Sequence, residues 1–111
     1  MNRINVKALS INKAYRGRRF RTPDYDSYES EVMYKLPREI EFDREEDIEL
    51  HLLVGLSSKN ADLSNTIKCF EDILQKKYSF NDKKVAKIVM EKEMVAKGDE
   101  FIEFNITNII I

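Results

Sequence analysis

Two acids and a lysine between positions 62 and 82 have the types and spacing to act on a phosphate. Asp62 precedes an apolar helical pattern, Lys68 lies about one turn inside that pattern, and Asp82 comes just before the next apolar run. Carboxylate oxygens are ligands that Mg²⁺ uses in proteins, and a helix start favours a bound phosphate. If both acids meet near Lys68, they form a site for a divalent cation and a phosphate.

The elements around these residues must bring them together. A run of alternating apolar residues at 48–55 predicts a strand that leads to Asp62, and residues 65–76 carry an apolar stripe at helical spacing. Ser64 is expected to cap this helix, because its hydroxyl can accept from the free amides of the first turn. Asp82 returns to Asp62 only if the strand expected at 84–94 lies beside the strand at 48–55.

This stretch of the chain resembles the signature of RusA-type Holliday junction resolvases. The family reads roughly Asp-x-Asp-Asn-x-x-Lys, then an Asp four residues on, then an Asp-Asp pair that opens a strand. Here the first motif runs from Asp62 to Lys68, Asp72 follows, and Asn81-Asp82-Lys-Lys-Val85 matches the later pair. The resemblance extends to a basic segment from Asn12 to Thr22, and therefore covers most of the chain.

The resemblance implies a metal-dependent endodeoxyribonuclease that binds four-way (Holliday) DNA junctions as a homodimer and cleaves them by paired cuts. It implies a role in DNA recombination and repair, in the cytoplasm of a bacterial or phage-infected cell. Mg²⁺ is the expected cofactor, with Mn²⁺ as an alternative. By position it assigns catalysis to Asp62, Asp82 and Lys68, metal binding to Asp62 and Asp82, and supporting roles to Ser64, Asn65 and Asp72.

Two positions depart from the family pattern. Ser64 stands where the family has its second Asp, and Asn81 stands for the first Asp of the later pair. A carboxylate about 4 Å from a unit charge contributes roughly 4 kcal/mol at an effective dielectric near 20. The serine therefore weakens metal binding, although Mg²⁺ is often held by only one or two carboxylates with phosphate and water.

Charge is distributed unevenly along the chain. Residues 1–21 carry seven basic residues and no acid, so the net charge of −1 leaves −8 for the other 90 residues. Arginines interleaved with Tyr15 and Phe20, and a turn at Gly17, favour a loop that grips DNA phosphates. The simpler alternative is a solvated loop. The candidate DNA-binding residues are Lys13, Arg16, Arg18, Arg19 and Arg21.

The whole chain of 111 residues, 42% of them hydrophobic, is expected to form a single RusA-like domain that does not span a membrane. Further expected elements are a strand at 3–9, a helix at 23–36 capped by Thr22, and a last strand at 100–107 that pairs with 84–94 across a turn at 97–99. This order predicts an α/β (α+β) domain with a mixed, mostly antiparallel sheet and two main helices.

Several polar or reactive residues have a structural interpretation that outweighs a functional one. We expect His51 to be structural within its strand, Cys69 to be a buried thiol, and the acidic segment 39–49 to form a solvated turn. The oily tail at 109–111 either extends the sheet or covers a second subunit.

Two other functions stay open. One is a RusA-like protein that binds DNA junctions but has lost catalysis through Ser64. The other is a protein-interaction domain that uses the acidic segment and has no affinity for junctions.

Overall fold

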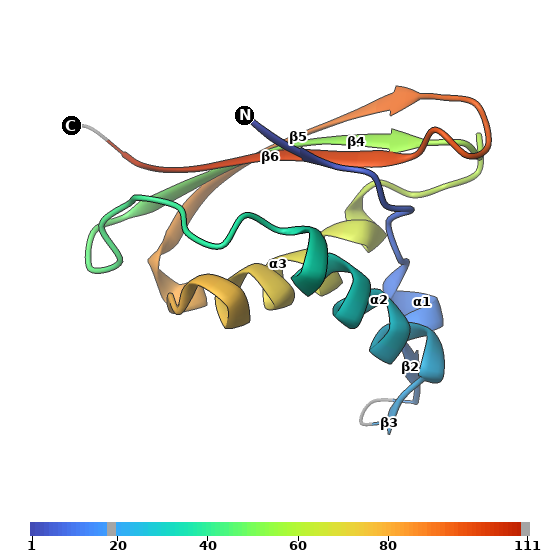
Figure 1. Cartoon of the computed structure of the whole chain (residues 1–111), viewed down its shortest axis with the longest axis horizontal. Helices are drawn as coiled ribbons and strands as arrows, with labels where there is room; N and C mark the ends of the chain where they lie inside the picture. The colour runs from blue at the N-terminus through green and yellow to red at the C-terminus, as the bar shows by residue number, and fades with distance from the viewer. Residues whose placement is uncertain (18–19, 110–111) are drawn as a thin grey trace.

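The structure, a computed structural model that describes residues 1–17 and 20–109, is built on a four-stranded sheet with helices on one face (Figure 1). The strand order is β1-β6-β4-β5, and β2 and β3 form a separate two-stranded ribbon. The elements in chain order are β1 (Asn2–Ile4), α1 (Ile11–Ala14), β2 (Tyr15–Arg16), β3 (Phe20–Arg21), α2 (Pro23–Lys35), β4 (Ile48–Leu56), α3 (Ser64–Tyr78), the 3-10 turn η1 (Asp82–Lys84), β5 (Val85–Met94) and β6 (Phe101–Asn108).

The predicted α+β class is confirmed, and the sheet is mixed. β6 pairs antiparallel with both β1 and β4, whereas β4 and β5 are parallel. Parallel neighbours need a long crossover connection, and α3 provides it. The expected placement of the strand after Asp82 beside the strand before Asp62 is therefore confirmed.

The core lies between the sheet and the two long helices. Phe70 of α3 meets Phe104 of β6 edge to face, with ring centroids 5.5 Å apart, and both side chains are fully buried. Aromatic pairs in this geometry contribute about 0.5 to 1.5 kcal/mol beyond the area that they bury. The expected stripe of α2 is also confirmed, since all four of its members are buried: Tyr25, Tyr28, Val32 and Leu36.

Two expectations about strands were wrong. The first strand covers only Asn2–Ile4, because the chain then leaves the sheet to reach α1. The last strand, β6, does not pair with β5. β4 lies between them and takes β6 on one edge and β5 on the other. The turn at 97–99 therefore carries the chain across β4, whose alternate side chains are buried along its whole length.

No helix among the residues that the structure describes is long and apolar enough to cross a membrane.

A tight contact between Gly55 and Phe101 offers a test of the β4-β6 packing. A Cβ added at Gly55 would lie 2.4 Å from two ring carbons of Phe101, which is 3% exposed. We expect Gly55→Ala to lower the free energy of unfolding by about 1 to 3 kcal/mol, the usual effect of overpacking. Urea titration measures it. Phe101→Leu in the same background should recover part of the loss, whereas two simply additive losses would contradict the contact.

Candidate functional site

Asp62 organises the start of α3. Its carboxylate accepts hydrogen bonds from the backbone amide of Ser64 at 3.0 Å and from the Ser64 hydroxyl at 2.8 Å, with the Asn65 side chain at 3.5 Å. The prediction that Ser64 caps the helix was wrong. Ser64 is the first helical residue and its hydroxyl donates to Asp62. An aspartate just before a helix accepts from the free amides of the first turn, so Asp62 takes the role expected of Ser64.

A cavity of about 490 Å³ opens beside Asp62. Asp62 and Asn65 line one side of it, and Asn12 and Lys13 from the basic segment line another. The structure thus brings together two of the sequence segments that carry the RusA resemblance, although they lie about fifty residues apart in the chain. Asp62 is exposed to solvent, so its carboxylate is accessible from this cavity.

Further charged residues of the cavity were missed in the sequence. Lys7 lines it from the segment after β1, and Glu100 lines it from the position just before β6. Glu100 accepts from the Ser57 hydroxyl at 2.7 Å, and this hydrogen bond lowers the pKa of the Glu100 carboxyl. No local pattern marks these residues, because Lys7 reaches Glu100 through the pairing of β1 with β6, and Ser57 reaches it through the pairing of β4 with β6.

Lys68 and Asp72 form an ion pair on α3, with 3.1 Å between Nζ and Oδ1. The hydrogen bond to Asp72 raises the pKa of the Lys68 ammonium, and the negative charges of Glu71 and Asp82 act in the same direction. Lys68 is half-exposed, so this positive charge is available to a ligand. The structure therefore pairs Lys68 with Asp72 and leaves Lys68 within the influence of the negative charge of Asp82.

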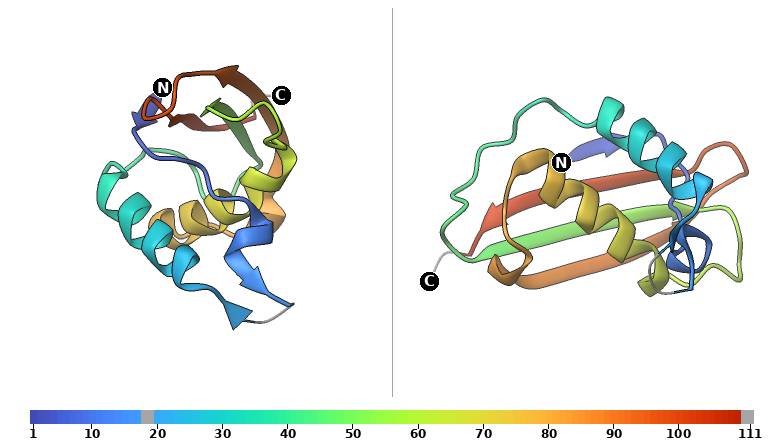
Figure 2. Two further views of the ribbon diagram at one scale, coloured as in Figure 1. Left: turned by 90° about the vertical axis from the view of Figure 1, so that its right-hand side faces the viewer. Right: turned by 90° about the horizontal axis from the view of Figure 1, so that it is seen from below.

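Asp62 and Asp82 do not meet within one chain. Asp62 precedes the first turn of α3 and Asp82 follows its last turn, so the helix separates them; fifteen residues at a rise of 1.5 Å span about 22 Å. In the right-hand view of Figure 2, the chain before α3 and the turn before β5 lie at opposite ends of the helix. Across 1–17 and 20–109, no group of three acids, histidines or cysteines is placed to hold a metal ion. One copy of the chain therefore holds the two acids of the expected Mg²⁺ or Mn²⁺ site at opposite ends of α3.

The β2-β3 ribbon, which contains Arg16 and Arg21 of the basic segment, projects from the body of the molecule (Figure 1). Arg16 lies opposite Phe20 in the ribbon, and the Phe20 side chain is 73% exposed. The ribbon is anchored at its base by Thr22, whose hydroxyl donates to the carbonyl of Lys13 at 2.6 Å and whose amide donates to Ala14 at 2.9 Å. An arginine and an aromatic ring are thus held on a projection with a fixed base.

The predicted DNA-binding residues fall into three groups. Arg21 is engaged within the molecule: its guanidinium contacts Asp26 at 3.0 Å and Glu29 at 3.3 Å and stacks over Tyr25. Arg16 and Lys13 are exposed, and neither forms an ion pair with a described residue. Arg18 and Arg19 lie outside the described residues.

The structural interpretations of His51 and Cys69 agree with the fold. His51 lies on the open face of the sheet, with Nε2 2.5 Å from Glu49, far from the cavity on the helical side. This hydrogen bond lowers the pKa of the Glu49 carboxyl. Cys69 is buried, and its burial raises the pKa of the thiol. The acidic segment before β4 is an exposed turn, as expected.

Glu71 is expected to make the stability of the folded protein depend on pH. Its burial raises the pKa of the Glu71 carboxyl, and the charges of Asp72 and Asp82 add to this effect against the opposing charge of Lys68. An acid with a raised folded-state pKa binds protons more readily when folded, so stability falls as the pH rises from the ordinary pKa of a glutamate through the raised one. We expect Glu71→Gln to be more stable than the wild type at neutral pH and equally stable below that window. Thermal unfolding across pH measures the difference; a constant gap at all pH values would contradict it.

Comparison with models of protein families finds no match for this chain, and comparison with curated protein sequences finds none either.

Proposed function

We propose that this chain binds branched DNA, with four-way junctions as the substrate class, through the β2-β3 ribbon and the cavity beside Asp62. The observation that carries the proposal is the meeting of Asn12 and Lys13 with Asp62 and Asn65 around one cavity. These residues belong to the two segments that resemble the RusA-type resolvases.

The chemistry of the ribbon supports a nucleic-acid ligand. An exposed arginine neutralises backbone phosphates, and an exposed aromatic ring stacks on unpaired bases, which every branch point offers. Arg16 and Phe20 provide this combination side by side. Arg21 instead holds the ribbon against α2, since Asp26 and Glu29 neutralise its charge.

The second part of the proposal concerns cleavage, for which we consider two candidate functions. A metal-dependent resolvase is supported by the position of Lys68 beside Asp72 and within the electrostatic reach of Asp82. A junction binder that does not cut is supported by Ser64 and by the separation of Asp62 from Asp82 in one chain. Of the two, the geometry of a single copy favours the binder.

A homodimer is the assembly we propose, because a four-way junction is two-fold symmetric and two equivalent cuts need two equivalent sites. We place its role in DNA recombination and repair, in the cytoplasm of a bacterial cell or a phage-infected host, as the resemblance implies.

Binding to a labelled four-way junction tests the first part. We expect Phe20→Ala to weaken binding by about 1 to 3 kcal/mol through lost stacking, and Arg16→Ala to weaken it and reduce the salt slope by about one. Lys97→Ala, in the β5-β6 turn away from the ribbon, is the control and should bind normally. Fluorescence anisotropy over a salt series measures these changes. Equal affinity for junction and linear duplex, or no binding at low salt, would reject the proposal.

Incubation of junctions with the protein and Mg²⁺ or Mn²⁺ separates the resolvase from the binder. A resolvase makes symmetric paired nicks that Asp62→Asn and Asp82→Asn abolish, whereas a binder leaves the DNA intact. In either case we expect Ser64→Asp to increase cutting, because it adds the carboxylate that the family pattern has at this position. An unchanged rate in Ser64→Asp would show that this position takes no part in the reaction.

A further inference from the structure

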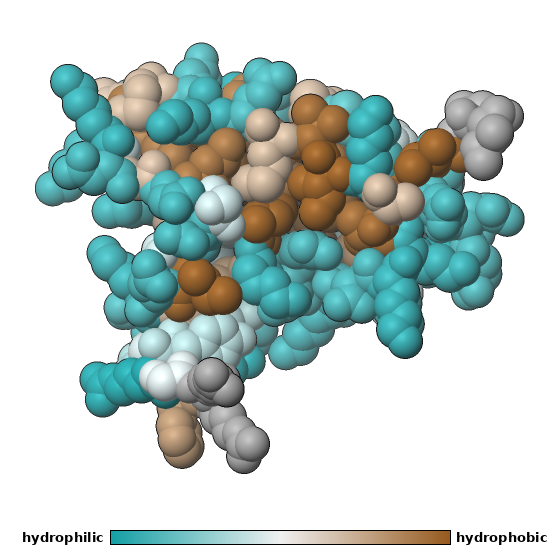
Figure 3. Space-filling view, turned by 180° about the vertical axis from the view of Figure 1, so that it is seen from behind, coloured by the Kyte–Doolittle hydropathy of each residue, from teal (hydrophilic) through white to brown (hydrophobic). Residues whose placement is uncertain are grey.

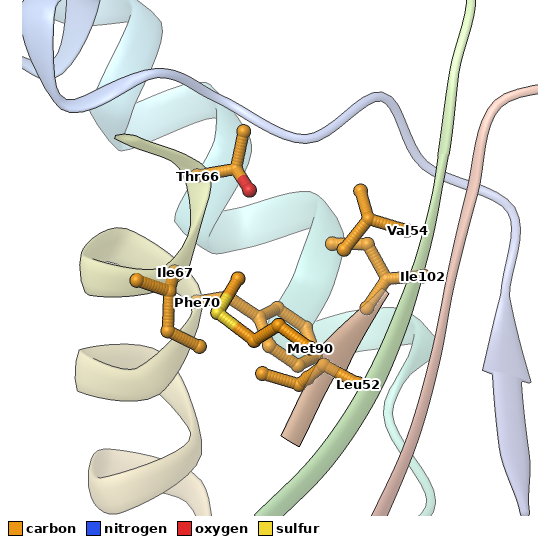
Figure 4. A pocket seen from close by; sticks show the side chains of 7 residues that line it. All are labelled: Leu52, Val54, Thr66, Ile67, Phe70, Met90 and Ile102. Carbon is orange, nitrogen blue, oxygen red and sulfur yellow. The ribbon is translucent and has the colours of Figure 1, made fainter. Parts of the chain in front are cut away.

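The cavity beside Asp62 has the size of a ligand site. Its volume of about 490 Å³ falls within the roughly 300 to 1,000 Å³ that is typical of small-molecule pockets. The recess between α3 and β5 in Figure 4 differs from it, since its lining is almost wholly apolar and it has no space for a water molecule. Figure 3, which looks at the molecule from behind, shows hydrophobic surface gathered over the middle of the molecule. Of these features, the cavity is the one that combines volume with many polar side chains.

One wall of the cavity is held in place within the protein itself. The Glu100 carboxylate accepts from the Ser57 hydroxyl at 2.7 Å and from the backbone amide of Gly98 at 2.8 Å. The Val95 amide donates to the carbonyl of Leu56 at 2.9 Å, so the loop after β4 and the turn before β6 are joined twice. A preformed cavity spares its ligand the cost of ordering these loops.

Part of the lining is apolar. Leu56 belongs to the core, and Leu9 and Ala61 are half-buried against that core. Enzymes that take a base out of the DNA stack hold its flat face against apolar or aromatic side chains. This part of the lining therefore suits the face of a flat ring.

Amide side chains supply much of the polar lining, through Asn12, Asn60 and Asn65. The Asn65 side chain donates to Asp62 at 3.5 Å. Among the described residues, no hydrogen bond occupies the side-chain amides of Asn12 and Asn60. Each amide has two donor hydrogens and one acceptor oxygen, and the edges of nucleobases present donors and acceptors together. The asparagines thus match the edge of a base better than a phosphate, which only accepts.

The charge of the lining also disfavours a phosphate inside the cavity. Two lysines and three acids line it, which gives a net charge of −1: Lys7, Lys13, Asp24, Asp62 and Glu100. Both lysines are exposed, so they can neutralise a phosphate that stays in solvent at the mouth. These charges favour a neutral ring inside the cavity and a phosphate outside it.

We propose that this cavity accommodates one unpaired nucleobase, extruded from the branch point of the bound DNA. The inference rests on the proposed function, because it names the part of the DNA that enters the site. Extruding a base costs least where the base is already unpaired, as at a branch point. The base of the β2-β3 ribbon adjoins the cavity, since Thr22 holds the carbonyl of Lys13, which lines the cavity. DNA on the ribbon would therefore lie next to the cavity mouth.

Removal of the base and blockage of the cavity, alone and together, test this assignment. Fluorescence anisotropy compares an intact four-way junction with one that carries abasic residues at the branch point. Ser58 is exposed and lines the cavity, so Ser58→Trp should block it, whereas Ser30→Trp on the exposed side of α2 is the matched control. We expect the abasic junction to bind the wild type and Ser30→Trp about fivefold or more weakly, the lower limit for one bidentate base contact. In Ser58→Trp the penalty should be about fivefold smaller.

Stacking on Phe20 can also contribute to the abasic penalty, but Ser58→Trp does not alter that contribution. An equal penalty in Ser58→Trp and the wild type, or no penalty in the wild type, would overturn the proposal. Asn60→Ala provides a second variant that removes an exposed amide of the lining, with Asn5→Ala as its exposed control outside the cavity. The first should reduce the penalty and the second should leave it unchanged.

Free deoxynucleosides distinguish a site for any nucleobase from one that needs the DNA strand. We expect each of the four, at millimolar concentrations, to shift the amide signals of residues 57–61 in nuclear magnetic resonance spectra of the wild type but not of Ser58→Trp. Inorganic phosphate should leave these signals in place. Shifts with phosphate and none with deoxynucleosides would overturn the proposal.

The outcomes separate this inference from the proposed function. Junction binding with an abasic penalty that Ser58→Trp does not change would reject the cavity assignment and leave junction binding standing. A response to deoxynucleosides without junction binding would reject the proposed function and retain the cavity as a nucleobase site. No response to either would overturn both.

Discussion

The parallel pairing of β4 and β5 is the constraint on which the rest of the structure depends. A strand can lie parallel to the preceding one only if the connection returns to the other end of the sheet, and α3 makes that return. The buried side of α3 then covers the sheet and completes the core through Phe70, Ile73 and Leu74. The same return places Asp62 and Asp82 at opposite ends of the helix. The element that stabilises the fold therefore separates the two acids that a metal site would need together.

A second set of interactions fixes the ribbon that we propose to contact DNA. Thr22 caps α2 by accepting from the Tyr25 amide, and its hydroxyl also donates to the carbonyl of Lys13. Arg21 links the base of the ribbon to Glu29, which in turn pairs with Lys76 of α3 at 3.1 Å. Charge from the basic segment is thus used in part to hold α2, α3 and the ribbon in one arrangement. Arg16 and Phe20 at the far side of the ribbon remain free for a partner.

Helices and strands were predicted correctly from the sequence where a single local pattern of residues determines them. The stripe of α2, the Thr22-Pro23 start and the alternation of β4 each depend on residues close together in the chain, and all three are confirmed. Contacts between distant segments were harder. The turn at 97–99 suggested a hairpin between β5 and β6. Whether β6 pairs with β5 or with β4 depends on which edge of β4 is free, and no residue near the turn determines this.

The candidate site shows the same limit. The start of α3 was recognised from its motif, yet the exchange of roles between Asp62 and Ser64 depends on backbone geometry that residue types do not specify. The neighbourhood of Lys68, Asp72 and Asp82 agrees with the spacing on the helix and the return of the chain. How far Asp82 lies from Asp62 could not follow from spacing, because it depends on the length of α3, which runs from Ser64 to Tyr78.

Pulsed electron spin resonance on a chain labelled at Lys59 and Lys83, both exposed, most directly tests the claim that α3 holds the two acids apart in one copy. Diluting the doubly labelled chain into unlabelled protein gives the distance within one copy. We expect a distance of about 22 Å or more, the span of the fifteen residues of α3. A distance well below this span would contradict the claim.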